Sequence, residues 1–123
     1  MDTGKVSVTG EGELRIKVGR HFGLDEAVLC MRNCPHPSVG SARRVVFDLC
    51  GTKTIQTAGL GFMLMVKERC QLEREHAVIV YDDAHIGQML YLSHFEEKFH
   101  LVLREPHVRN STRSENEAKG EAA

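Results

Sequence analysis

The segment from Val45 to Met65 constrains the fold of this chain most strongly, because it joins a buried strand to a helix. Val45–Leu49 is short, β-branched and almost entirely apolar, which is typical of a central strand covered on both faces. After a polar loop, an apolar helix is predicted from about Ala58 to Arg69. The hydroxyl of Thr57 is therefore predicted to lie at a helix N-terminus, on a surface rather than in a cleft.

A second unit of the same kind follows in the C-terminal half of the chain. Ala77–Tyr81 is another short apolar strand. Asp82 and Asp83 come directly after it and are well placed to cap a helix from about Ala84 to Ser93. The stronger interpretation of these two aspartates is therefore helix capping rather than an acidic pocket.

The remaining elements follow from hydrophobic periodicity. In chain order they are strands at 6–9 and 13–18 that form a hairpin, a helix on which Leu24, Ala27, Val28 and Met31 make one stripe, and a last strand at 99–103. Pro35 and Pro37 end the first helix. The order β-β-α-β-α-β-α-β predicts an α/β fold, with helices packed on a mixed central β-sheet.

The predicted helix at 58–69 carries more apolar side chains than one stripe needs. One stripe consists of Phe62, Met63, Val66 and Cys70, and three further apolar residues, Leu60, Leu64 and Met65, fall outside it. Cover by a neighbouring helix is one explanation. The other is an exposed patch that binds a partner protein.

Composition indicates one globular domain with a tail. The chain has 123 residues, of which 41% are hydrophobic and 27% charged. We expect the domain to span residues 1–104. From Glu105 to Ala123 the only sizeable aliphatic side chain is Val108, so this segment is expected to be a flexible, disordered tail.

Charge and hydropathy exclude several classes of partner. The formal net charge of -1 argues against direct binding to nucleic acid or to an acidic membrane surface. The longest apolar run, Leu60 to Val66, is far shorter than the roughly 20 residues that span a bilayer. No signal peptide is evident, so a cytoplasmic protein without membrane insertion is expected.

Candidate catalytic and metal-binding groups are sparse. Cys30 and Cys34 are spaced i, i+4 near His36, but no second pair of ligands has matching spacing, so thiols packed in the core are favoured. Cys50 has no nucleophile-elbow motif around it. We therefore expect neither a metal, nor a cofactor, nor an enzyme.

Three segments resemble one family. The sequence VFDLCGTKTIQTAGLG at 46–61 looks like the signature of STAS domains. The sequence IKVGRHF at 16–22 is similar to the second strand of bacterial anti-sigma factor antagonists, and residues 79–99 are similar to their fourth strand and third helix. The resemblance covers Glu13 to Val102 and implies a STAS-like fold.

The resemblance also implies a site. In the family, a Ser or Thr that follows an Asp in the signature loop accepts a phosphate; Thr57 occupies that position here, and Gln56 replaces the Asp. The alternative interpretation of Thr57 is a simple helix cap. The residues expected to bind a partner are Gln56, Thr57, Ala58, Gly59, Leu60, Met65 and His85.

The implied function is that of an anti-sigma factor antagonist in transcription regulation. Such a module would sequester an anti-sigma factor that is a serine/threonine kinase. Phosphorylation at Thr57 would release the kinase, because a phosphate adds about -1.5 to -2 charge to the binding surface. A PP2C-type phosphatase would reverse the modification. The second hypothesis is a STAS subunit of a bacterial lipid-transport ABC complex without a phospho-switch, and the third is a small enzyme or ligand-binding domain.

Overall fold

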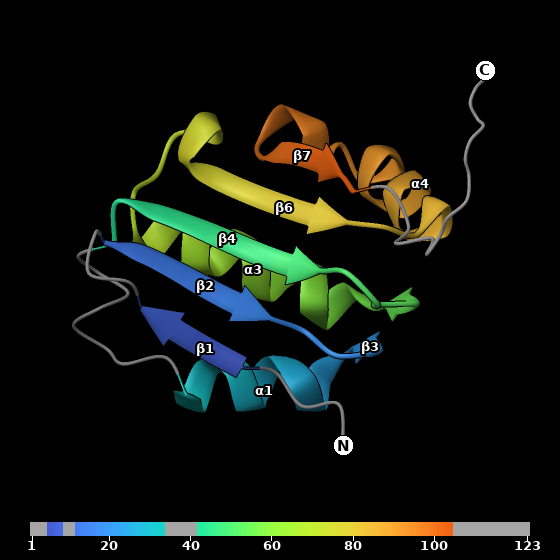
Figure 1. Ribbon diagram of the computed structural model, residues 1–123, viewed down its shortest axis with the longest axis horizontal. Coiled ribbons are helices and arrows are strands. Elements are labelled where there is room, and N and C mark those ends of the chain that lie inside the picture. The colour runs from blue at the N-terminus through green and yellow to red at the C-terminus, as the bar shows by residue number, and fades with distance from the viewer. Residues whose placement is uncertain (1–4, 9–11, 34–41, 105–123) are drawn as a thin grey trace, which may run out of the picture.

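A mixed five-stranded sheet organises the molecule. The structure, a computed structural model, describes residues 5–8, 12–33 and 42–104. The strands lie in the order β1 (Lys5–Val8), β2 (Glu13–Lys17), β4 (Arg44–Leu49), β6 (Ala77–Tyr81) and β7 (His100–Leu103). β1 pairs with β2 in the antiparallel direction, and the other neighbours are parallel (Figure 1).

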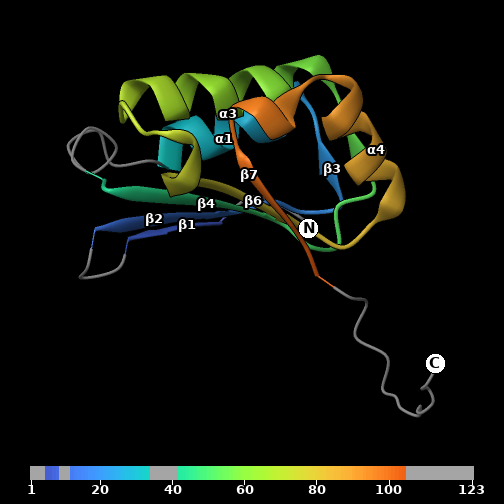
Figure 2. The same cartoon turned by 90° about the horizontal axis from the view of Figure 1, so that it is seen from above.

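A second, very small sheet extends from one end of the first. It pairs β3 (His21–Phe22) with β5 (Thr54–Ile55) in the parallel direction. The helices are α1 (Leu24–Asn33), α3 (Thr57–Arg69) and α4 (Ala84–Leu92), with 3₁₀ turns η1 (Arg74–His76) and η2 (Phe95–Glu97). Figure 2 shows all three α-helices on the same side of the sheet, so the described part has two layers.

The main core lies between the helices and the sheet. Phe47 on β4 is fully buried and makes edge-to-face contacts with Phe62 of α3 and with Phe99, at centroid distances of 6.4 Å and 6.0 Å. Phe22 of β3 contacts Phe62 in the same way at 6.1 Å. These aromatic pairs join the small sheet, α3 and the large sheet into one packed unit.

The opposite face of the sheet carries no helix among the described residues. Val46, Val78 and Val80 form a small buried cluster there. Charged side chains from β2 and β4 lie beside these valines, as the register of Arg15 with Val46 shows. The predicted burial of β4 on both faces is thus confirmed, but helices cover only one of them.

All eight predicted elements are present in the predicted order, and the mixed α/β architecture is confirmed. The buried stripe Phe62, Met63, Val66 and Cys70 of α3 is also confirmed. The two-residue strands β3 and β5 were not predicted, because each is too short to show a period. The predicted tail at 105–123 lies outside the described residues.

The predicted helix α1 is present, but of the four residues in its predicted stripe only Ala27 is buried. Leu24, Val28 and Met31 are exposed, whereas Ala27 and Cys30 face the core. Periodicity marks a repeating face but does not say which face packs. The small side chains of Ala27 and Cys30 supply the packed face of α1 in place of the larger ones.

Within the described ranges, no helix has both the length and the apolar character needed to cross a membrane.

Cys34, His36 and both prolines that were expected to end the first helix lie outside these ranges.

Candidate functional site

The small sheet fixes the start of α3. Phe22 pairs with Ile55, and the carbonyl of Phe22 accepts a hydrogen bond of 2.9 Å from the N–H of Gln56. Both Phe22 and Ile55 are buried. Thr57 follows as the first residue of α3 and is exposed. The Thr57 hydroxyl is therefore presented on a surface by a rigid, buried support.

Gly59 brings α3 into direct contact with β3. A Cβ atom at this position would lie 2.7 Å from the Phe22 carbonyl oxygen and 2.9 Å from the Phe22 Cγ. Real Cβ atoms essentially never approach other atoms so closely, so only glycine fits here without a shift of the backbone. This contact explains why position 59 is a glycine.

Gly61 has a different environment. It is exposed, and a Cβ atom there would have no neighbour within 4 Å. Gly61 therefore does not make room for a packed neighbour. A glycine inside a helix costs about 0.5–1 kcal/mol relative to alanine, and no packing contact offsets that cost here.

The N-terminus of α3 has no side-chain cap. Gln56 is the N-cap residue, and its side chain makes no capping hydrogen bond. The first turn contains no acidic residue. Among the described residues, nothing accepts a hydrogen bond from the N–H of Thr57 or Ala58. The interpretation of Thr57 as a simple helix cap is wrong, because the cap position belongs to Gln56.

The Gln56 side chain turns towards β3 instead. A Cβ atom at Gly23 would lie 2.6 Å from the Gln56 Oε1 and 2.8 Å from the His21 Nε2. Both polar groups therefore lie over the bare backbone of Gly23. The His21 ring is in turn hydrogen-bonded to the Thr54 hydroxyl. These contacts form a polar rim beside the exposed Thr57.

The other residues expected to bind a partner are less exposed or lie elsewhere. Ala58 is half-buried at the start of α3. Leu60 and Met65 are partly buried against the main core, as is Leu64, which agrees with cover by neighbouring elements. His85 is exposed, but it lies on the first turn of α4.

The start of α4 is capped by its own chain. Asp83 accepts a hydrogen bond of 2.7 Å from the N–H of His85, which confirms the predicted capping role. This hydrogen bond, together with Lys53 at 3.3 Å, holds the pKa of the Asp83 carboxyl below its usual range. Asp82, which was also expected to cap α4, instead accepts a hydrogen bond of 3.0 Å from the N–H of Gly51 in the loop after β4. Both aspartates therefore serve helix and loop structure.

Sequence reasoning missed the residues that hold the loop before β5. Thr52 is fully buried, and its hydroxyl donates a hydrogen bond of 2.7 Å to the Gly19 carbonyl. The N–H of Lys53 donates a hydrogen bond of 2.7 Å to the Arg20 carbonyl. Their partners are more than 30 positions away in the sequence, so no local signal identifies them.

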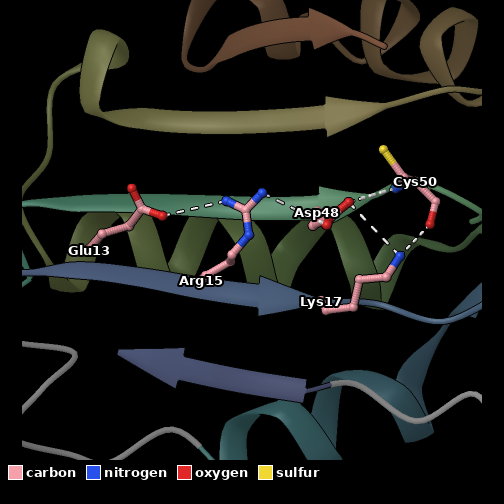
Figure 3. Close-up of polar contacts among 5 residues, drawn as sticks. All are labelled: Glu13, Arg15, Lys17, Asp48 and Cys50. Atoms are coloured by element: carbon pink, nitrogen blue, oxygen red, sulfur yellow. Dashed lines mark hydrogen bonds and ion pairs between the residues drawn. The ribbon is translucent and has the colours of Figure 1, made fainter. Parts of the chain in front are cut away.

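A polar network lies on the helix-free face of the sheet (Figure 3). The Asp48 carboxylate lies 4.0 Å from a guanidinium nitrogen of Arg15 and 3.9 Å from the Lys17 ammonium, and it accepts a hydrogen bond of 3.0 Å from the N–H of Cys50. Burial and the Asp48 charge raise the pKa of the Cys50 thiol. This environment disfavours the thiolate that a cysteine nucleophile needs.

One group of possible metal ligands lies close together among the described residues. Donor atoms of His94, Glu96 and Glu97 fall within 4.8 Å of one another after the end of α4. The imidazole of His94 and the carboxylate of Glu97 are 3.7 Å apart, and both are largely exposed. Cys30, the one described member of the sequence-based metal candidate, is buried in the main core.

Comparisons with known proteins add no family to this geometry. No family model matches the chain, and no curated protein matches it either.

Proposed function

We propose that this chain is a STAS-type, protein-binding regulatory module that acts as an anti-sigma factor antagonist. Its partner is an anti-sigma factor with serine/threonine kinase activity, and the contact surface is the start of α3. The observation that carries the proposal is the exposed hydroxyl of Thr57 on a helix end without a side-chain cap. The resemblance of residues 46–61 to the STAS signature supplies the class of partner.

The surface around Thr57 suits docking of a protein. Thr57 and Gly61 are one helical turn apart on α3, and both are exposed. Neither has a long side chain, so the backbone of a partner can approach closely. The contact between Gly59 and Phe22 keeps this surface rigid beneath the partner.

Phosphorylation of Thr57 would separate the complex without unfolding the module. The unsatisfied N–H groups at the start of α3 and the helix dipole favour negative charge at this position. A partner packed on the same surface would instead have to bury a dianion, which is unfavourable. Loss of binding with retention of the fold is the expected behaviour of such a switch.

The test is phosphorylation and binding with candidate anti-sigma factor kinases from the same genome. Incubation with ATP followed by mass spectrometry should place one phosphate on Thr57. The Thr57→Glu variant should lose kinase binding in calorimetry while its melting temperature stays equal or rises. Gln88→Glu, which adds the same charge at an exposed position of α4, is the matched control and should bind normally.

The alternative is an unswitched STAS subunit of a lipid-transport ABC complex. Gln56 favours this function, because the acidic residue before the phosphoacceptor is replaced by an amide whose side chain lies over Gly23. An unmodified Thr57 after incubation with the kinases, together with unchanged partner binding by Thr57→Glu, would reject the switch and leave this alternative.

A further inference from the structure

Helix α1 presents an apolar stripe to solvent. The exposed fractions are 62% for Leu24, 40% for Val28 and 48% for Met31. At about 100° per residue, these three side chains fall within about 60° of one another on the helix. The other exposed large hydrophobic residues of the described ranges are Tyr91, Leu92 and Leu103, so α1 carries half of this set.

The stripe is not a part of the core that happens to be loosely packed. Ala27 and Cys30 already supply the core-facing side of α1 and are buried. α1 contacts β1, β3 and α3, and Figure 1 shows it at the β1 edge of the sheet rather than over its centre. A row of apolar side chains at the edge of the helix layer is the kind of surface that another protein covers.

The charges beside the stripe indicate what kind of surface would cover it. Asp25 lies in the first turn of α1 and Arg32 in the last, and both are exposed. On the helix they fall within about 20° of one another, along one flank of the stripe. One end of the flank is thus acidic and the other basic, which makes the surface complementary to itself.

We propose that α1 is a self-association surface on which a second copy of this chain docks through its own α1, in the antiparallel direction. A two-fold axis perpendicular to the helices reverses the direction of the second α1 and keeps the flanks aligned. Val28 then meets Val28 of the second copy, and Leu24 lies near Met31 of the second copy. Asp25 faces Arg32 of the second copy, twice by symmetry, and the two helix dipoles run in opposite directions.

The resulting dimer is weak. A 10-residue helix buries less surface than the roughly 1,200–2,000 Å² of stable complexes. We therefore expect a dissociation constant between the micromolar and millimolar ranges. The self-association concerns α1 and does not depend on the function proposed for Thr57.

The test is sedimentation equilibrium of the full chain over a concentration series up to the millimolar range. The wild-type protein should show a reversible monomer–dimer equilibrium. Val28→Asp should weaken it at least about tenfold, because two carboxylates would meet at the two-fold axis. Leu92→Asp, at a position on α4 that is 74% exposed, is the matched control and should leave the equilibrium unchanged.

A charge exchange tests the antiparallel arrangement itself. Asp25→Arg alone and Arg32→Glu alone should each weaken the dimer about two- to tenfold, because each places like charges opposite one another twice. An equimolar mixture of the two variants should recover wild-type affinity, since both contacts in the heterodimer then join opposite charges. Circular dichroism of each variant checks that α1 remains folded.

Two results would overturn the proposal. One is a wild-type chain that stays monomeric throughout the series, which would leave the stripe to a different protein or to another segment of this chain. The other is a dimer that survives Val28→Asp but is lost in Leu92→Asp, which would place the contact on α4.

Discussion

Helices α3 and α4 begin in similar surroundings but complete their N-termini differently. Each has a glycine in its first turn that contacts an aromatic ring, Gly59 on Phe22 and Gly87 on Tyr81. At α4, Asp83 caps the helix with its side chain. At α3, the cap residue Gln56 makes no such bond, and no acidic residue compensates.

The start of α4 is thus completed by a side chain of the same chain, whereas the start of α3 is not. α4 is satisfied by its own chain, since Asp83 both accepts the N–H of His85 and pairs with Lys53. α3 keeps the N–H groups of Thr57 and Ala58 available, beside the exposed hydroxyl of Thr57. A helix end that is held firmly but left uncapped suits a surface that a partner or a phosphate completes.

Mutation of the contact between α3 and β3 is expected to have the largest effect on stability. Gly59→Ala should lower the free energy of unfolding by about 2 kcal/mol, because the added methyl group clashes with the Phe22 carbonyl. Urea denaturation measures the change. Gly61→Ala is the matched control and should raise stability by about 0.5–1 kcal/mol, because its Cβ meets open space. Equal effects at the two positions would show that α3 does not pack directly against β3 at Gly59.

Removal of the α4 cap gives the next largest effect. Asp83→Ala should cost about 1 kcal/mol at neutral pH. The folded-state pKa of Asp83 is lowered, so its contribution to stability is complete above the unfolded value of about 4 and is lost as the pH falls through the folded value. Thermal melts of both proteins from pH 7 to pH 2 should therefore converge at the acidic end. A difference that is constant across this range would exclude the carboxylate as its source.

Introducing a capping side chain at the start of α3 is expected to have the smallest effect on stability. Gln56→Asp should raise the free energy of unfolding by about 0.5–1 kcal/mol, because the shorter carboxylate can accept the free N–H groups of α3. Gln56→Asn separates hydrogen bonding from charge and should give part of the gain. A loss of stability in both variants would mean that the contact of Gln56 over Gly23 outweighs a cap.

The features of the fold that could be predicted join residues close together in the sequence, whereas those that were missed join residues far apart. Asp83 was correctly expected to cap α4, because a cap and its N–H partner are two residues apart. The pairing of β3 with β5 was missed, because it joins positions 33 residues apart that show no period of their own. At the candidate site, Thr57 was placed at the helix start from sequence, but the cap position of Gln56 was not recognised.

The sequence by itself determined the order of the elements, the burial of the apolar strands β4 and β6 and the buried stripe of α3, because each depends on a local run or period of apolar side chains. The tertiary structure alone decided which face of α1 packs and leaves Leu24, Val28 and Met31 in solvent. It also decided that Gly59 is required by a contact while Gly61 is not. These outcomes depend on distances between segments that are far apart in the sequence, and local sequence patterns do not specify such distances.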